Sequence, residues 1–171
     1  DKVLYPFGFG LSYTEFEIKT EKAEITEGVV KLSVLVKNIG SYNGKEVIEV
    51  YCEAPQGRLG KAARVLCGFE KTRELAPQEE QTIEIEVDIA KLASYDDSGV
   101  TGNKSCYVLE AGEYKFYVGS DVRSAEYACS FEQGETLVTV RLTQALAPVE
   151  SFERIKPVCE GGAFSIGRES V

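Results

Sequence analysis

Apolar and polar residues alternate along several stretches in the middle of the chain. Between residues 82 and 89, Ile83, Ile85 and Val87 occupy every second position and are separated by acidic residues. A period of two puts alternate side chains on one face of a strand, so this stretch predicts a strand with that face over an apolar core. The same alternation predicts strands over residues 32–37, 48–53 and 114–119, with further candidates at 64–71, 126–132 and 135–143.

Turn-forming residues separate these stretches, and the sequence has no sustained helical periodicity. The turn pairs are Glu27-Gly28, Asn43-Gly44, Ala76-Pro77 and Ala111-Gly112, and only residues 88–93 predict a short helical turn. A parallel sheet needs crossover helices, which this pattern does not provide. The sequence therefore predicts an all-β fold, an antiparallel β-sandwich of about seven or eight strands.

The two ends of the chain lack this alternation. Residues 1–14 combine aromatic rings with Gly and Pro, and they predict an irregular loop whose rings need a neighbouring surface. Residues 145–171 contain two Pro residues and Gly161-Gly162, and they predict a linker or a strap that lies across the sandwich. The sandwich itself is expected over residues 15–144.

Composition narrows the possible functions. The 28 Asp and Glu residues exceed the 19 Lys and Arg residues, and the net charge of −9 argues against a nucleic-acid partner. The chain has no His, which excludes Ser-His-Asp and Cys-His catalysis and imidazole ligation of a metal. It has no Met, so we expect it to be a piece of a larger protein. No apolar run approaches the roughly 20 residues that cross a bilayer, so no membrane partner is expected.

The cysteines indicate the redox environment. The chain has five, at positions 52, 67, 106, 129 and 159, with no Cys-x-x-Cys pair. An odd number at irregular spacing fits reduced, buried thiols better than a disulfide framework or a zinc site. Reduced thiols predict a cytoplasmic location.

Two segments carry residue types that chemistry could use. Asp96 and Asp97 are adjacent, but neighbours in an extended segment point in opposite directions, whereas glycosidase chemistry needs two carboxylates that face each other. The following Ser98-Gly99 favours a turn. Residues 56–64 hold two Gly and three basic residues, yet they lack the spacing and the Ser or Thr of a phosphate-binding loop. A solvated loop is the better interpretation, and we expect no catalytic residue, cofactor or metal in this chain.

Several longer stretches resemble known sequences. Residues 5–14 read Tyr-Pro-Phe-Gly-Phe-Gly-Leu-Ser-Tyr-Thr. Residues 34–40 read Val-Leu-Val-Lys-Asn-Ile-Gly, and residues 44–51 read Gly-Lys-Glu-Val-Ile-Glu-Val-Tyr. Residues 66–71 read Leu-Cys-Gly-Phe-Glu-Lys, and residues 112–119 read Gly-Glu-Tyr-Lys-Phe-Tyr-Val-Gly. The first resembles the segment that closes the α/β sandwich domain of glycoside hydrolase family 3 enzymes, mainly β-glucosidases, with Phe9 where the family commonly has His or Tyr. The others resemble the fibronectin type III-like domain of the same family. The resemblance implies an immunoglobulin/fibronectin type III-like sandwich.

Some positions in these stretches have an expected physical role. Gly40, Gly44 and Gly112 are expected at turns where the backbone needs a positive φ. Phe69 is expected to pack between the two sheets and to hold one against the other.

The resemblance also implies a domain order. Residues 93–99 and 102–109 resemble a subgroup from anaerobic bacteria in which an α/β sandwich precedes the fibronectin-like domain and the catalytic barrel follows it. On that pattern, residues 1–14 end the preceding α/β sandwich domain, residues 15–144 form the fibronectin-like domain, and residues 145–171 connect to the barrel. The protein is then expected in the bacterial cytoplasm.

The family's catalytic motifs do not occur in this sequence, so the implied role is that of a non-catalytic accessory domain. It would support a retaining β-glucosidase, with the flanking domains of the same polypeptide as partners, and a homo-oligomer is left open. The expected contacts with the neighbouring domains are Tyr5, Phe7, Phe9 and Tyr13. In the isolated chain these four rings are expected to be exposed or to fold back on the sandwich. A loop with Tyr95, Asp96 and Asp97 is expected near substrate. The alternatives are a carbohydrate-binding module and an independent immunoglobulin-like interaction module.

Overall fold

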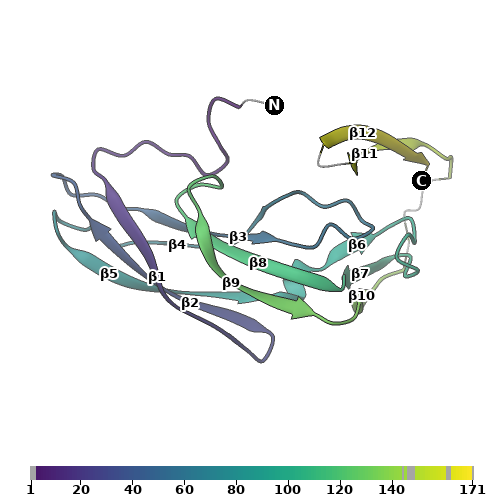
Figure 1. Ribbon diagram of the computed structural model, residues 1–171, viewed down its shortest axis with the longest axis horizontal. Coiled ribbons are helices and arrows are strands. Elements are labelled where there is room, and N and C mark those ends of the chain that lie inside the picture. The colour runs from purple at the N-terminus through teal and green to yellow at the C-terminus, as the bar shows by residue number, and fades with distance from the viewer. Residues whose placement is uncertain (1–2, 144, 146–148, 161–162, 171) are drawn as a thin grey trace. The chain divides into compact units, whose positions relative to one another are not determined.

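The computed structural model describes residues 3–143, 145, 149–160 and 163–170, and these residues form mostly strands (Figure 1). In chain order the elements are β1 (Phe16–Thr26), β2 (Val29–Asn38), β3 (Val47–Glu53), β4 (Val65–Lys71), β5 (Glu80–Asp88), the 3₁₀ turn η1 (Ile89–Leu92), β6 (Ser94–Asp96), β7 (Cys106–Leu109), β8 (Gly112–Gly119), β9 (Glu126–Gln133), β10 (Leu137–Arg141), β11 (Glu153–Glu160) and β12 (Ala163–Ser170). The all-β prediction is confirmed. Within the described part of the chain, no helix has the length and apolar character needed to cross a membrane.

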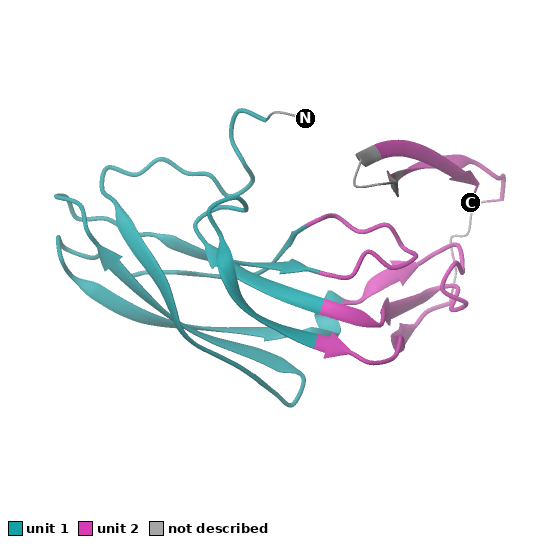
Figure 2. Cartoon of the chain, in the orientation of Figure 1, with its two compact units in different colours: residues 1–53, 64–92, 114–131 teal, residues 54–63, 93–113, 132–171 magenta. Residues whose placement is uncertain are grey.

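The chain divides into two compact units (Figure 2). Unit 1 comprises residues 1–53, 64–92 and 114–131, and unit 2 comprises the remainder. Unit 1 holds an antiparallel three-stranded sheet in the order β1-β2-β5 and an antiparallel four-stranded sheet in the order β4-β3-β8-β9. Glu27 and Gly28, both with positive φ, make the tight turn between β1 and β2.

The core of unit 1 is built from the alternation seen in the sequence. The inward residues of the three-stranded sheet are buried, among them Val30, Leu32, Val34, Val36, Ile83, Ile85 and Val87. The inward residues of the four-stranded sheet are buried as well, among them Ile48, Val50, Tyr114, Phe116 and Val118. Two sheets whose apolar faces pack against each other and exclude water form a β-sandwich, which confirms the predicted fold class.

The packing between the sheets contradicts the role expected for Phe69, whose side chain is 65% exposed. The inward residue is its neighbour Gly68, where a Cβ would lie 3.1 Å from Val87 and 3.4 Å from Ile85. The pairing of β3 with β4 shifts its register between Val50 and Tyr51, which is a β-bulge. The bulge explains the wrong prediction, because simple alternation along β4 does not hold across it.

Unit 2 holds a three-stranded sheet in the order β10-β7-β6 and the hairpin β11-β12. Within the unit, Cys106, Val108 and Leu109 of β7 are buried. The strands β6, β7, β11 and β12 were not expected, and residues 145–171 were predicted as a linker or strap. The register of β11 with β12 runs without a shift from Glu153 opposite Ser170 to Glu160 opposite Ala163.

The cysteines described in full are Cys52, Cys67, Cys106 and Cys129, and no disulfide is seen among them. Cys52 and Cys106 are buried, whereas Cys67 and Cys129 are half-buried. Burial raises the pKa of Cys67 to about 12, so the thiol form dominates at neutral pH. The side chain of Cys159 lies outside the described residues, and the cytoplasmic location stays a prediction.

Candidate functional site

Asn38 attaches the C-terminal end of the aromatic N-terminal segment, residues 3–14, to the rest of unit 1. The Asn38 side chain is fully buried and accepts hydrogen bonds from the Thr14 hydroxyl at 2.7 Å and the Gly40 amide at 3.1 Å. Its amide nitrogen donates to the carbonyl oxygens of Tyr42 at 2.7 Å and Leu75 at 2.9 Å. One side chain therefore joins the segment, the loop after β2 and the loop after β4.

Two glycines near Asn38 make room for the segment. A Cβ at Gly40 would collide with the Thr14 hydroxyl and lie 2.7 Å from the backbone nitrogen of Glu15. A Cβ at Gly44 would lie 2.6 Å from the Thr14 methyl group. Neither glycine has a positive φ, so that prediction is wrong for both, while Gly112 has the expected positive φ of 132°. What Gly40 requires is close approach of the backbone of residues 14–15, and what Gly44 requires is close approach of the Thr14 and Phe16 side chains.

A second attachment lies at Phe7. Its carbonyl oxygen accepts hydrogen bonds from the Val122 amide at 3.0 Å and the Tyr51 hydroxyl at 3.3 Å. The rings of Phe7 and Tyr51 meet edge to face with centroids 6.4 Å apart. Burial and the adjacent Glu49 carboxylate, which also accepts from the Tyr51 hydroxyl, hold the pKa of Tyr51 above its usual range. The hydroxyl therefore keeps its proton and acts as a donor.

Between and before these attachments the segment presents its rings to solvent. Tyr5, Phe7, Phe9 and Tyr13 are 63%, 66%, 44% and 95% exposed, respectively. Tyr5 and Phe9 stack on each other with centroids 4.9 Å apart. The structure thus places all four predicted contact residues on one attached, exposed apolar segment.

A cavity of about 380 Å³ in unit 1 is lined by residues 8–12 of the segment and by both acids and bases of the sandwich. Its acids have local structural partners: Glu46 accepts from the Val47 amide at 2.9 Å, and Asp121 accepts from the Arg123 amide at 2.8 Å. Burial raises the pKa of Glu46. These contacts cap the backbone near the cavity.

In unit 2, Asp96 closes the loop that follows β6. Its buried carboxylate accepts from the backbone amides of Gly99, Val100 and Thr101 at 2.7, 3.1 and 2.9 Å, and from the Thr101 hydroxyl at 2.5 Å. Burial alone raises the pKa of Asp96, but the hydrogen bonds led by Thr101 outweigh it and leave the pKa below its ordinary value. The turn interpretation fits this geometry, since every polar contact of the carboxylate is local.

Replacing Asp96 by Asn is expected to lower the free energy of unfolding at pH 7 by about 2 kcal/mol, because charge-assisted hydrogen bonds are lost. In the native chain this contribution is full above the ordinary pKa of 3.8 and disappears as pH falls through the lowered folded pKa. Denaturant unfolding at pH 7 and at about pH 2.5 measures both effects, and the gap between variant and native chain should shrink in acid. Asp97→Asn is the control, with an expected loss below about 1 kcal/mol; equal losses for the two variants would contradict the assignment.

The neighbouring residues have other partners. The Asp97 carboxylate pairs with Arg154, which also donates to Glu169 at 2.9 Å. The rings of Tyr95 and Tyr107 lie 5.3 Å apart, and Tyr95 is 38% exposed. Asp96 and Asp97 are therefore engaged separately. Arg154 and Glu169 were missed in the sequence because nothing in the pattern around Asp97 indicates a partner so far along the chain.

The basic, Gly-containing loop of residues 56–64 has a structural partner in Glu110. Lys61 and Glu110 form an ion pair of 3.1 Å, with side chains only 8% and 7% exposed. The same carboxylate accepts from the Arg58 amide at 2.8 Å and lies against Gly57, where a Cβ would collide with it. The segment is a loop, as predicted, but it is not wholly solvated, because a buried charge pair fixes it. Across the described residues, no cluster of Cys, Asp and Glu has the makings of a metal site.

Comparisons with known proteins agree with this architecture. Residues 46–122 match the model of the fibronectin type III-like domain. A β-glucosidase from Ruminococcus albus is 59% identical over 164 residues, which are 96% of this chain and 17% of that protein. β-Glucosidase A from Butyrivibrio fibrisolvens is 38% identical over 91% of this chain and 20% of its own length.

Solved structures give the same result. A β-glucosidase from Paenibacillus barengoltzii matches 100% of this chain with a TM-score of 0.94 and 44% identity, over 20% of its own length. β-Glucosidase 3B from Thermotoga neapolitana matches 78% of this chain with a TM-score of 0.68 and 35% identity, over 18% of its length. The chain thus spans about a fifth of the length of these relatives. It carries a fibronectin type III-like domain and is homologous to a segment of the β-glucosidases of glycoside hydrolase family 3.

Proposed function

We propose that this chain is the non-catalytic accessory part of a family 3 β-glucosidase and that it supports the domains on either side. The observation that carries the proposal is the N-terminal segment, which is attached at Phe7 and Thr14 yet exposes its rings. A monomeric surface rarely keeps such a group of large apolar side chains in water without a partner. Homology to about a fifth of each relative supports a partner within the same polypeptide.

The acidic residues support a role without catalysis. A retaining glycosidase needs two carboxylates about 5 to 5.5 Å apart that flank the sugar. Asp96 is committed to backbone amides, and Asp97 is paired with Arg154. The catalytic carboxylates are therefore expected in the parts of the enzyme outside this chain, with the α/β domain before it and the barrel after it.

The test is hydrolysis of an aryl β-glucoside by the purified chain, alone and mixed with the flanking domains. The chain alone should show no turnover, and mixing should restore activity, because the flanking domains need its support. A chain with Phe7→Ser and Phe9→Ser should restore at least about tenfold less activity at equal concentration, which corresponds to a loss of about 1.4 kcal/mol in association.

Tyr42→Ser is the matched control, because Tyr42 is 66% exposed and lies outside the segment. This variant should restore activity as well as the native chain does. Turnover by the chain alone would overturn the proposal. So would binding of soluble glucans by the chain combined with a failure to restore activity, which would favour a carbohydrate-binding module.

A further inference from the structure

The outer face of the three-stranded sheet in unit 1 is adapted to water. Across its strands the register aligns Glu24, Lys31 and Glu86 in one row, so that charges of opposite sign are neighbours. Lys31 and Glu86 form an exposed ion pair of 3.1 Å. In the adjacent row the Ser33 hydroxyl donates to Glu84 at 2.7 Å. Rows of paired polar side chains are what a solvated sheet face requires.

The outer face of the four-stranded sheet carries a row of apolar side chains between the charged positions Glu49 and Glu53. The register places Leu66 of β4 opposite Tyr51 of β3, and Tyr51 opposite Tyr117 of β8. The row continues to β9, because the rings of Tyr117 and Tyr127 meet edge to face with centroids 6.0 Å apart. Tyr127 is 58% exposed. An apolar row thus crosses all four strands of this sheet.

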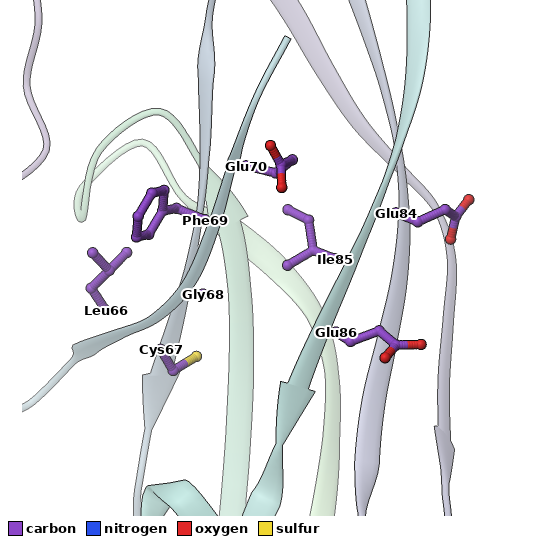
Figure 3. A pocket seen from close by; sticks show the side chains of 8 residues that line it. All are labelled: Leu66, Cys67, Gly68, Phe69, Glu70, Glu84, Ile85 and Glu86. Atoms are coloured by element: carbon purple, nitrogen blue, oxygen red, sulfur yellow. The ribbon is translucent and has the colours of Figure 1, made fainter.

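Phe69 extends this row at the edge strand. It lies opposite Glu49, on the same face as Leu66 because of the bulge in β4, and it is 65% exposed. Figure 3 shows Leu66 and Phe69 projecting to the side of β4 away from Ile85, which lies across a groove of about 440 Å³. Phe69 therefore contributes nothing to the core, although it lies in a stretch that resembles the family.

The face is preorganised by its own contacts. The guanidinium of Arg64 lies 3.6 Å from the centroid of the Tyr117 ring, donates to the Val122 carbonyl at 3.1 Å and approaches Glu53 at 3.7 Å. These contacts hold the Arg64 side chain over the aromatic ring. Rigid aromatic residues and Arg are the residue types that contribute most to protein interfaces.

The N-terminal segment lies on the same face. Phe7 contacts the ring of Tyr51, which is the central residue of the apolar row, and Gly8 lies against Glu49, which is opposite Phe69. The exposed rings of the segment and those of the sheet therefore form one continuous surface. The chain leaves this surface at its N-terminal side through Leu4 and Tyr5, which are 84% and 63% exposed.

We propose that the outer aromatic face, which comprises Leu66, Phe69, Tyr117 and Tyr127, docks against an apolar surface of the domain that precedes this chain in the full-length enzyme. This inference rests on the proposed function and extends its contact beyond the N-terminal segment. The preceding domain is the occupant because residues 4–9 reach it from this face. The charged outer face of the other sheet stays in water.

The test is hydroxyl-radical footprinting of the full-length enzyme, with oxidation rates read by mass spectrometry and divided by the intrinsic reactivity of each residue type. Phe69 and Tyr127 should be oxidised at least about fivefold more slowly than Tyr42, although all three have similar exposure in this structure. Protection of that size means that most of the exposed ring is covered. The measurement needs no substitution, so loss of folding cannot mimic the result.

The possible results separate the two proposals. Protection of Tyr5, Phe9 and Tyr13 with full oxidation of Phe69 and Tyr127 would overturn the docking of the outer aromatic face and leave the proposed function standing. Full oxidation of both groups would overturn both proposals. Protection that disappears on dilution of the enzyme would assign the face to a second copy and overturn the preceding domain as occupant.

A variant gives an independent check. Phe69→Lys in the full-length enzyme should lower the midpoint of thermal unfolding, because it places a charge in the contact. Lys31→Phe, which adds an aromatic ring to the charged face, is the matched control and should leave docking unchanged. The same substitution at position 69 in the 171-residue chain should leave its own midpoint within about 2 °C, as expected for an exposed site. An equal loss in both proteins would overturn the inference.

Discussion

Replacing Glu110 by Ala is expected to lower the free energy of unfolding of the chain by about 3 to 5 kcal/mol. The substitution leaves the Lys61 ammonium nearly buried, with an exposed fraction of only 8%, and without its carboxylate. It also removes the acceptor of the Arg58 amide and so releases the loop of residues 56–64. Chemical denaturation followed by far-ultraviolet circular dichroism measures the change.

A paired substitution distinguishes the charge effect from simple loss of packing. The double variant Lys61→Met/Glu110→Leu keeps the side-chain volume and removes both charges, so most of the lost stability should return. The coupling energy between the two sites should then exceed about 2 kcal/mol in a double-mutant cycle. Additive losses would show that the ion pair is not the source of the stabilisation.

Asn38→Ala is expected to cost about 3 kcal/mol, because one substitution removes four hydrogen bonds made by a fully buried side chain. The groups that lose this partner are the Thr14 hydroxyl, the Gly40 amide and the carbonyls of Tyr42 and Leu75. The Gly40 amide keeps a bond to the Glu15 carbonyl, and the Leu75 carbonyl keeps one from the Gly44 amide. The N-terminal segment should also loosen, since Thr14 is one of its two attachments. Limited proteolysis should therefore cut within residues 8–13 several times faster than in the native chain.

Asn43→Ala is the control for this prediction, because Asn43 is an exposed amide in the adjoining loop. Its effect should stay within about 0.5 kcal/mol, and the cleavage rate should not change. Loss of stability by Asn38→Ala without faster cleavage in the segment would mean that Phe7 alone holds it.

The clearest predictions are the strands with unbroken alternation, while β4, β9 and β10 were named only as further candidates and are also present. β2, β3, β5 and β8 each follow a period of two, and the structure has all of them. β1 was not predicted, because its register with β2 shifts between Thr20 and Lys22. The apolar residues therefore change from even positions, Phe16 and Ile18, to odd positions, Ala23 and Ile25. A bulge breaks the period on which the prediction depends.

The short strands and the final hairpin were missed for other reasons. β6 and β7 have 3 and 4 residues, too few for a period to be evident. β11 contains Pro157, which argues against a central strand, but in the described residues β11 pairs only with β12 and so is an edge strand. A proline is tolerated there because one side of the strand needs no partner.

The candidate site was predictable only in part. Tyr5, Phe7, Phe9 and Tyr13 stand out in the sequence as a cluster of aromatic rings outside any strand. The role of Asn38 was not evident, because its partners come from three separate segments of the chain. Phe69 was misplaced since one extra residue in β4 decides which face it occupies.

The two attachments of the N-terminal segment have a consequence for the kinetics of assembly. Residues 8–13 are held at Phe7 on one side and at Thr14 on the other, so they form a closed loop and not a free tail. Much of their conformational entropy is lost when the sandwich folds, and less remains to be lost on docking. A domain that folds separately would therefore meet a preformed contact surface, and association would not be slowed by a conformational search of the segment.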